Sequence, residues 1–293
     1  MMSKRVVIIP CFGEGHFTSL QIDNLMSIIS PDIIIYNEGL FPAGPENKGG
    51  IDTNFQKEFC YQNTNLAWDT ELVQHAIKEA QLRFPNTKII WNQMNYKTTD
   101  ANLCYVEAVS NFSELGIEIN EGDIIFPLEG DVFFHEDDVL LLNEYLEKLR
   151  PNDGLQAPYI DFMENQYYVE GTALNTNTIH YRRIAIKFGT WDYYKSIVVN
   201  FMSQKYPLTM FPKYIFHYAW WRPGKYKQLR IAQLRRDPEY HNNFLAGLEL
   251  AKECKDINIV VRPTRSENDP TRYICKIDIL HPKEITKHIN YIK

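Results

Sequence analysis

The chain has 293 residues, of which 44% are hydrophobic and 23% charged, and this is the composition of a folded globular protein. The 31 lysines and arginines are outnumbered by 37 aspartates and glutamates, so the net charge of −6 argues against a dedicated nucleic-acid binder. No stretch approaches the roughly 18 apolar residues of a transmembrane helix. The five scattered cysteines contain no Cys-x-x-Cys pair, which favours a reducing compartment. We therefore expect a cytoplasmic protein, with peripheral attachment to a membrane as the alternative.

The first 150 residues alternate short apolar runs with amphipathic segments, which is the signature of a largely parallel α/β sheet. The apolar runs predict buried strands, and the segments with helical periodicity predict the helices between them. The expected strands are Arg5–Ile9, Asp32–Tyr36, Lys88–Trp91 and Asp123–Leu128, and the expected helices are His16–Ser30, Asp69–Phe84, Asp100–Phe112 and Glu136–Leu149.

After Pro151 the pattern changes to shorter segments interrupted by polar turns, which predicts antiparallel strands mixed with helices. The expected strands here are Tyr159–Phe162, Tyr167–Val169, Thr178–Ile186 and Tyr214–Ala219, and the expected helices are Tyr193–Gln204, Lys225–Arg235 and Asn242–Cys254. Ile257–Val261 and Tyr273–Ile279 are expected to pair as a hairpin before a short last helix.

Polar residues follow each of the first four expected strands, and ligands of open α/β sheets bind at such strand ends. The sharpest motif is Glu129-Gly130-Asp131, directly after an apolar strand. Two carboxylates at this spacing can hold a divalent cation that bridges the oxygens of a diphosphate, and the glycine would leave room for the diphosphate. The alternative is a turn followed by a helix cap, because Asp and Gly are common turn residues.

A second motif lies downstream, where His217 sits in an apolar strand and is followed by Arg222 and Lys225 around a Pro-Gly turn. Cations at a turn suit a departing diphosphate, on which charge develops as a glycosyl bond breaks. The alternatives are a core histidine and the solvated start of a basic helix.

Together these residues resemble a known family. IPCFGEGH at 9–16 resembles the P-x-y-N-E opening of family 2 glycosyltransferases, with Gly13-Glu14 in place of Asn-Glu. Glu129-Gly130-Asp131 resembles the D-x-D metal motif of GT-A glycosyltransferases, with Glu for the first Asp, and His217 resembles their late histidine. The chain thus resembles a divergent family 2 member over about residues 5–230. This implies a GT-A-like (Rossmann-like) mixed sheet flanked by helices, with a helical and hairpin C-terminal extension.

The resemblance also implies a domain organisation and a set of ligand contacts. Residues 1–240 would form the GT-A-like domain, with a nucleotide-sugar half at 1–135 and an acceptor half at 136–240, and residues 241–293 would pack on it as an extension. Asp131 and His217, with Glu129 directly or through water, would hold Mn²⁺ or Mg²⁺ on the donor. The residues expected to border the nucleotide and its diphosphate are Pro10, Phe12, Glu14, Glu38, Glu129, Arg222 and Lys225.

An inverting enzyme of this kind also needs a carboxylate to deprotonate the acceptor hydroxyl. Asp192, behind Trp191, is the closest match to the family pattern, and Asp161 and Glu164 are its rivals. Asp192 would equally serve as a helix N-cap. The aromatic surplus of 13% predicts a dense core, from which Trp191, Trp220 and Trp221 stand out as candidates for a sugar-binding wall.

The expected function is transfer of a sugar from a nucleotide diphosphate to a hydroxyl of a glycan, glycoconjugate or small molecule. One alternative is a nucleotidyltransferase, although its first loop would usually carry a cation that PCFGEGH lacks. A glycosyltransferase acting on modified DNA bases and an inactive nucleotide-sugar-binding module are the other two alternatives. The oligomeric state is not indicated by the sequence.

Overall fold

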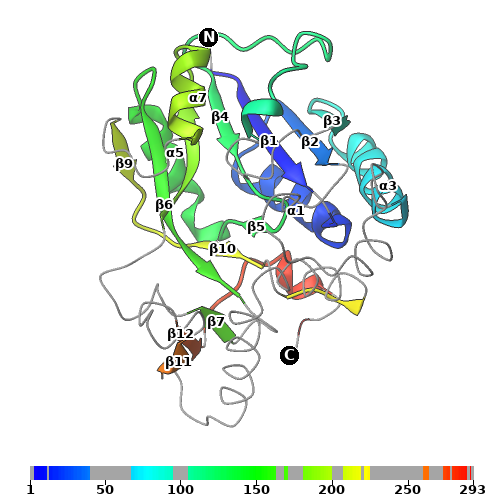
Figure 1. The fold of residues 1–293 in the computed structure, drawn as a ribbon, viewed down its shortest axis with the longest axis vertical. Helices are drawn as coiled ribbons and strands as arrows, with labels where there is room; N and C mark the ends of the chain where they lie inside the picture. Colours follow the sequence, from blue (N-terminus) through cyan, green and yellow to red (C-terminus); the bar gives the residue numbers. More distant parts are fainter. Residues whose placement is uncertain are drawn as a thin grey trace, which may run out of the picture.

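A mixed β-sheet with helices on both faces forms the body of the protein (Figure 1). The computed structural model describes residues 3–11, 13–39, 67–94, 105–162, 168–170, 181–199, 207–218, 221–224, 260–263, 273–277, 279–288 and 291. The α/β class expected from the sequence is confirmed. The expected helices Lys225–Arg235 and Asn242–Cys254 lie outside the described residues, and the division into domains stays a prediction.

Within the described ranges the main sheet has nine strands, in the order β3-β2-β1-β4-β8-β6-β10-β5, with β9 paired to β6. Strands β3, β2, β1 and β4 are mutually parallel, β8 is antiparallel to both β4 and β6, and β10 is parallel to β6. The ends of β1, β2, β4, β6 and β10 therefore meet the start of β8 at one edge. The strands are β1 Arg5–Cys11, β2 Ile33–Gly39, β3 Lys88–Met94, β4 Ile124–Pro127, β5 Val132–Phe133, β6 Gly154–Asp161, β8 Tyr181–Lys187, β9 Leu208–Met210 and β10 Ile215–His217.

Both faces of the central strands are buried, which explains their nearly continuous apolar sequences. Val7 and Ile9 of β1 face a core formed with helices α1 (Gly15–Ile28), α3 (Ala67–Arg83) and α5 (Val139–Lys148). Val6 and Ile8 face a second core formed with residues 105–117 and helix α7 (Trp191–Val199). Successive residues of β1 thus pack into the cores on opposite faces of the sheet, and this fixes the strand between the two layers of helices.

Several boundaries differ from those expected. Strand β6 begins at Gly154 instead of Tyr159, and α7 begins at Trp191 instead of Tyr193. Of the expected helix Asp100–Phe112, the described part is helical only at 105–107 and continues as turns to 116. The strands β5 and β9 were not expected, because two or three residues are too short to leave a period-2 pattern. None of the helices in the described ranges is long and apolar enough to cross a bilayer.

The late part of the chain forms a second, three-stranded sheet and then returns to the main body. Strand β11 (Val260–Pro263) pairs antiparallel with β12 (Tyr273–Lys276), which confirms the expected hairpin, and β12 also pairs with β7 (Tyr168–Glu170). Beyond it, Ile277 and Ile285 pack in a third core cluster with Phe17, Phe216 and Trp221. The 3₁₀ turn η2 (Ile285–Lys287) therefore lies against α1 and β10.

His288 anchors this returning segment through its ring. The ring stacks on Phe17, with centroids 4.9 Å apart, and lies 4.7 Å from the ring of Trp221. Burial lowers the pKa of His288 from 6.5 to about 4, because the charged form would lose its hydration.

This pKa predicts a pH dependence of stability. The folded state keeps His288 neutral until the pH approaches about 4, whereas the unfolded state binds a proton at this residue as the pH falls below 6.5. The free energy of unfolding therefore decreases over this range. In His288→Phe, which keeps a ring but cannot titrate, this loss is absent. The unfolding free energy of the wild type should fall relative to that of His288→Phe by up to about 3 kcal/mol between pH 7 and pH 4. Urea denaturation across this range measures it, and parallel curves for the two proteins would contradict the assignment.

Candidate metal and nucleotide-sugar site

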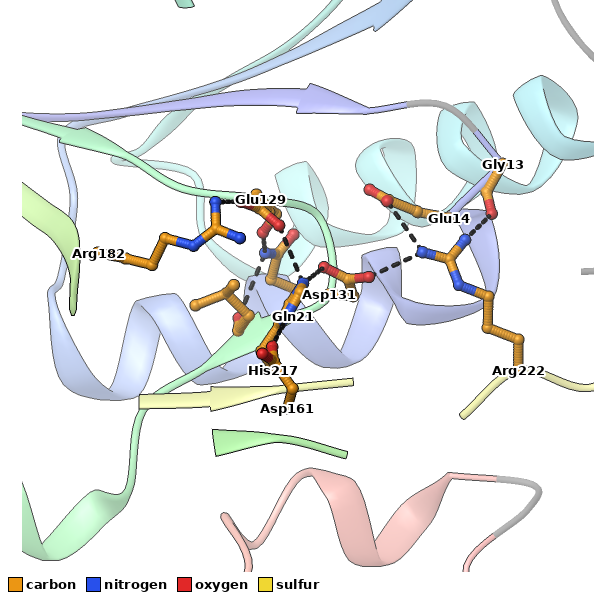
Figure 2. A network of polar contacts seen from close by, with 10 residues as sticks. Gly13, Glu14, Gln21, Glu129, Asp131, Asp161, Arg182, His217 and Arg222 are labelled. Carbon is orange, nitrogen blue, oxygen red and sulfur yellow. Dashed lines mark hydrogen bonds and ion pairs between the residues drawn. The ribbon is translucent and has the colours of Figure 1, made fainter. Parts of the chain in front are cut away.

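Glu129, Asp131 and His217 meet at the edge of the sheet where the strands end (Figure 2). The Nε2 atom of His217 lies 2.9 Å from Oε2 of Glu129 and 3.2 Å from Oδ1 of Asp131. Asp131 and His217 are buried, and Glu129 is partly exposed. The three residues come from two places in the sequence, the loop after β4 and the end of β10. Antiparallel pairing of β5 with β10, with Val132 opposite His217, brings these two places together.

Two buried polar residues of α1 fix the loop that carries the carboxylates. Gln21 donates from Nε2 to the carbonyl of Glu129 at 2.6 Å, and its own Oε1 accepts from the Tyr36 hydroxyl at 2.9 Å. Asn24 donates to the carbonyl of Phe134 and accepts from its N–H. Sequence reasoning missed both residues. The available signal was their position three residues apart on the apolar face of a helix, where an amide needs a buried partner.

The carboxylates surround the imidazole with negative charge. Burial alone would lower the pKa of His217, but Asp131, Glu129 and Asp161 raise it well above its ordinary value. Glu129 also binds Arg182 of β8, whose Nη1 lies 2.8 Å from Oε1. Burial would raise the pKa of Glu129, and Arg182 and His217 lower it on balance. Glu129 is thus ionised. The carboxylates of Glu129 and Asp131 both face Nε2 of His217, so the space at this nitrogen favours a positive charge.

Arg222 joins the motif after β4 to the loop after β1. Its Nη2 lies 2.8 Å from Oδ2 of Asp131 and 3.1 Å from Oε1 of Glu14, and its Nη1 donates to the carbonyl of Gly13 at 2.8 Å. Gly13 has a φ of +68°, a left-handed conformation that favours glycine and turns its carbonyl toward the guanidinium. The side chains of Arg222 and Asp131 are each only 2% exposed. Arg222 thus lies beside the motif within a network of protein contacts, and its expected role at the diphosphate stays a prediction.

Glu14 lies directly over Gly130. A Cβ atom added to Gly130 would stand 2.1 Å from Oε2 of Glu14, so the glycine allows this carboxyl group to approach. That oxygen is buried and has no hydrogen-bond partner among the described residues. Burial and the charge of Asp131 raise the pKa of Glu14 to about 8, against the opposing effect of Arg222. In this structure the space over Gly130, expected for a diphosphate, is filled by Glu14.

Glu38 and Pro10 lie at the same edge but in different surroundings. Glu38 ends β2 beside β1, and its two carboxylate oxygens accept from the Thr70 hydroxyl and the Trp91 indole N–H, each at 2.6 Å. Only 1% of Glu38 is exposed, so these contacts fix α3 and β3 to β2. Pro10 is a half-buried residue within β1, opposite Asn37. Phe12 and Lys225 lie outside the described residues.

The three candidate bases lie in different places. Asp161 ends β6 and contacts Nδ1 of His217, so it belongs to the cluster. Asp192 is an exposed residue at the start of α7, which follows the far end of β8. Because β8 runs antiparallel to β4, the structure puts Asp192 at the opposite edge of the sheet from Glu129 and does not bring it to the cluster. Glu164 falls outside the described part of the chain.

Where they are described, the tryptophan candidates pack in the core or against it. Trp221 is 1% exposed and packs with Tyr218, and Trp191 packs on Phe112 and Phe188. Trp220 is not among the described residues. The ring that packs on His217 is instead that of Tyr159.

An open pocket adjoins Glu129. Its walls combine hydroxyl, guanidinium and apolar groups, and the Arg182 guanidinium lies 5.6 Å from the centre of the Tyr159 ring. The bulge in the β6–β8 ladder between Leu155 and Gln156 lies beside it. The residues that line it are Tyr105, Pro127, Glu129, Tyr159, Arg182, Arg183 and Val198.

The cluster fits a divalent cation. Its three ligand atoms, two carboxylate oxygens and one imidazole nitrogen, all lie within 4.8 Å of one another. Neighbouring ligands of an octahedral ion at ~2.1 Å stand roughly 3 Å apart, close to the two distances from Nε2. Carboxylates suit Mg²⁺ and Mn²⁺, and the added imidazole favours the transition metal.

The contact between Glu14 and Gly130 makes a testable prediction about stability. Gly130→Ala should destabilise the protein by about 1–3 kcal/mol, because the new methyl group displaces a buried carboxyl group. In a Glu14→Ala background the same change should cost much less, because Oε2 and Cδ are gone and only the Cβ atom at 3.3 Å remains. Urea denaturation of the four proteins in this double-mutant cycle measures the coupling. Equal costs in the two backgrounds would show that Gly130 is needed for another reason.

Comparisons with known proteins give remote likenesses. No protein-family model and no curated protein matches the sequence. The chain is similar to a nucleoside-diphosphate-sugar pyrophosphorylase from Vibrio cholerae RC9, with 8% identity over 73% of this chain and 96% of that chain and a TM-score of 0.34. It is also similar to a candidate glucose-1-phosphate thymidylyltransferase from Bacillus anthracis in complex with a sucrose. The identity is 11% over 80% of this chain and 96% of that chain, and the TM-score is 0.39. A third similar structure is that of a mycobacterial protein, with 9% identity over 97% of this chain and 87% of that chain and a TM-score of 0.35. At these values the function has to be inferred from the residues of the site.

Proposed function

We propose that the protein is a metal-dependent glycosyltransferase that moves a sugar from a nucleotide diphosphate to an acceptor hydroxyl. The observation that carries the proposal is the cluster of Glu129, Asp131 and His217 at the edge where parallel strands end. Such an edge is where open α/β sheets bind nucleotides, and this donor set suits an ion that binds phosphate oxygens. The resemblance of the same residues to the GT-A motifs supports the same reading.

The residues of the site have distinct roles under this proposal. Glu129, Asp131 and His217 would hold Mn²⁺ or Mg²⁺, which when bound neutralises the charge that develops on the departing diphosphate. Arg222 keeps Asp131 turned toward the ligand position and orders the loop at Gly13 and Glu14. The open pocket beyond Glu129 would receive the sugar or the acceptor, with hydroxyl and guanidinium groups to bind hydroxyls and tyrosine rings to pack on C–H faces.

One observation favours a second candidate, a nucleotidyltransferase. Enzymes of that kind use a cation at the first loop, and the loop sequence itself has none. Arg222 nevertheless lies against the first loop through the Gly13 carbonyl and Glu14. A sugar phosphate would then attack a nucleoside triphosphate and release pyrophosphate, at the same metal.

A ligand panel tests the two candidates together. The protein is incubated with Mn²⁺ and a set of nucleotide-diphosphate sugars, and in parallel with nucleoside triphosphates and sugar 1-phosphates. We expect metal-dependent binding by calorimetry and slow release of nucleoside diphosphate from one donor sugar. Release of pyrophosphate in the second arm would replace the glycosyltransferase by the nucleotidyltransferase. Binding without turnover would indicate a nucleotide-sugar-binding module, and absence of any binding would overturn both enzyme proposals.

The metal ligands are tested by substitution. Asp131→Asn should lose metal-dependent binding and lower turnover by at least about 100-fold, since a neutral amide is a poor ligand and leaves Arg222 without its charge partner. Asp137→Asn is the matched control, because Asp137 is an acid with a 79% exposed side chain in the turn after the motif. Thermal unfolding verifies that both variants are folded. Wild-type activity in Asp131→Asn would remove the metal assignment.

The raised pKa of His217 predicts how metal binding depends on pH. A proton and a metal ion compete for Nε2, and the neighbouring carboxylates keep His217 protonated well above pH 6.5. Metal affinity should therefore increase as the pH rises from 6 to 8, with about one proton released per ion bound. Calorimetry of Mn²⁺ binding in buffers of different ionisation enthalpy measures both quantities. An affinity that is constant over this range would mean that His217 is not a ligand.

A further inference from the structure

The two nitrogens of the His217 ring face different partners (Figure 2). Nε2 points to the oxygens of Glu129 and Asp131, as described above. Nδ1 contacts Oδ1 of Asp161. The ring thus lies between the candidate metal position on one side and a single carboxylate on the other.

The sheet itself fixes this second contact. Strands β6 and β10 are parallel neighbours, and Asp161 and His217 are register partners at their ends. The N–H of Phe162 donates to the carbonyl of His217 at 2.7 Å, so the pairing continues one residue past the carboxylate. In-register residues of adjacent strands project from the same face, which places the carboxylate beside the ring. The ring of Tyr159, 5.7 Å from that of His217, packs on the same side chain.

This arrangement has a defined chemical consequence. A carboxylate at Nδ1 holds a proton on that nitrogen and leaves the lone pair of Nε2 to a metal ion. It also fixes the ring plane and makes Nε2 more basic, and removing such a partner commonly weakens metal affinity 10- to 100-fold. A carboxylate held in this way faces the metal ligand and not an acceptor hydroxyl.

We propose that Asp161 is the positioning residue of the metal site, which holds the Nδ1–H of His217 and directs Nε2 toward Glu129 and Asp131. The inference rests on the proposed metal-dependent function and deepens it. It gives Asp161 the task of positioning His217, in place of the catalytic-base role for which the sequence made it a candidate. The carboxylate acts through His217 and does not contact substrate.

The test measures binding of Mn²⁺ alone to the full chain, by the loss of the free-ion paramagnetic resonance signal. Asp161→Ala should weaken Mn²⁺ affinity roughly 10- to 100-fold. Asp161→Asn, which can still accept from Nδ1–H but carries no charge, should weaken it less. Asp137→Ala should leave it unchanged. If Asp161→Ala does not fold, Asp161→Asn carries the test, and a wild-type affinity in that variant then overturns the proposal.

A second readout separates positioning from general support of the fold. In the wild type we expect a low-field proton resonance from the Nδ1–H of His217, assigned by its absence in His217→Gln. It should disappear or move upfield in both Asp161 variants. A residue with only a structural role would lower the unfolding temperature and leave this resonance and the Mn²⁺ affinity unchanged, which would overturn the inference.

The outcomes also distinguish this inference from the proposed function. If the wild type binds Mn²⁺ and Asp131→Asn does not, the metal site stands. Unchanged affinity in the Asp161 variants would then overturn the positioning role alone. A wild type that does not bind Mn²⁺ overturns the metal site and the positioning role together.

Discussion

The buried ion pair between Arg222 and Asp131 is the interaction on which the arrangement of the site depends. It ties the turn after β10 to the loop after β4, and through Gly13 and Glu14 it includes the loop after β1. A guanidinium this deeply buried costs several kcal/mol if its carboxylate is removed. If one of the three loops moved away from the others, a charge would be exposed or left buried without its partner. The loops therefore form a single unit.

Within that unit, the positively charged side chains differ in whether they can lose a proton. Glu129 divides its two oxygens between Arg182 and His217, and Asp131 divides its own between Arg222 and His217. The guanidinium groups are permanent charges, whereas the imidazole can give up its proton. A metal ion can thus enter by displacing the proton of His217, and both guanidinium ion pairs then stay in place. The length of the Glu129 side chain supplies the reach that lets Arg182 of a neighbouring strand take part.

The sequence was informative about strands and their ends and uninformative about which strands become neighbours. The apolar run of β1 and the carboxylates after β4 could be read directly, because burial on both faces and a turn both leave local patterns. The role of Arg182 could not be read, since it depends on the insertion of β8 between β4 and β6. The same insertion sends Asp192 to the far edge. Gln21 and Asn24 were missed because a polar residue on an apolar helix face does not reveal its partner.

The segment at 279–288 has a consequence for how the protein is made. Asn24 of α1 bonds Glu284, 260 residues later, and Tyr218, next to His217, bonds His281. At synthesis rates of roughly 5–20 residues per second, α1 waits roughly 15–50 s before this partner leaves the ribosome. Throughout that interval the apolar surface around Phe17 has no cover from Ile285 or His288. The nascent chain consequently leaves apolar surface uncovered on the same helix that will later support the site.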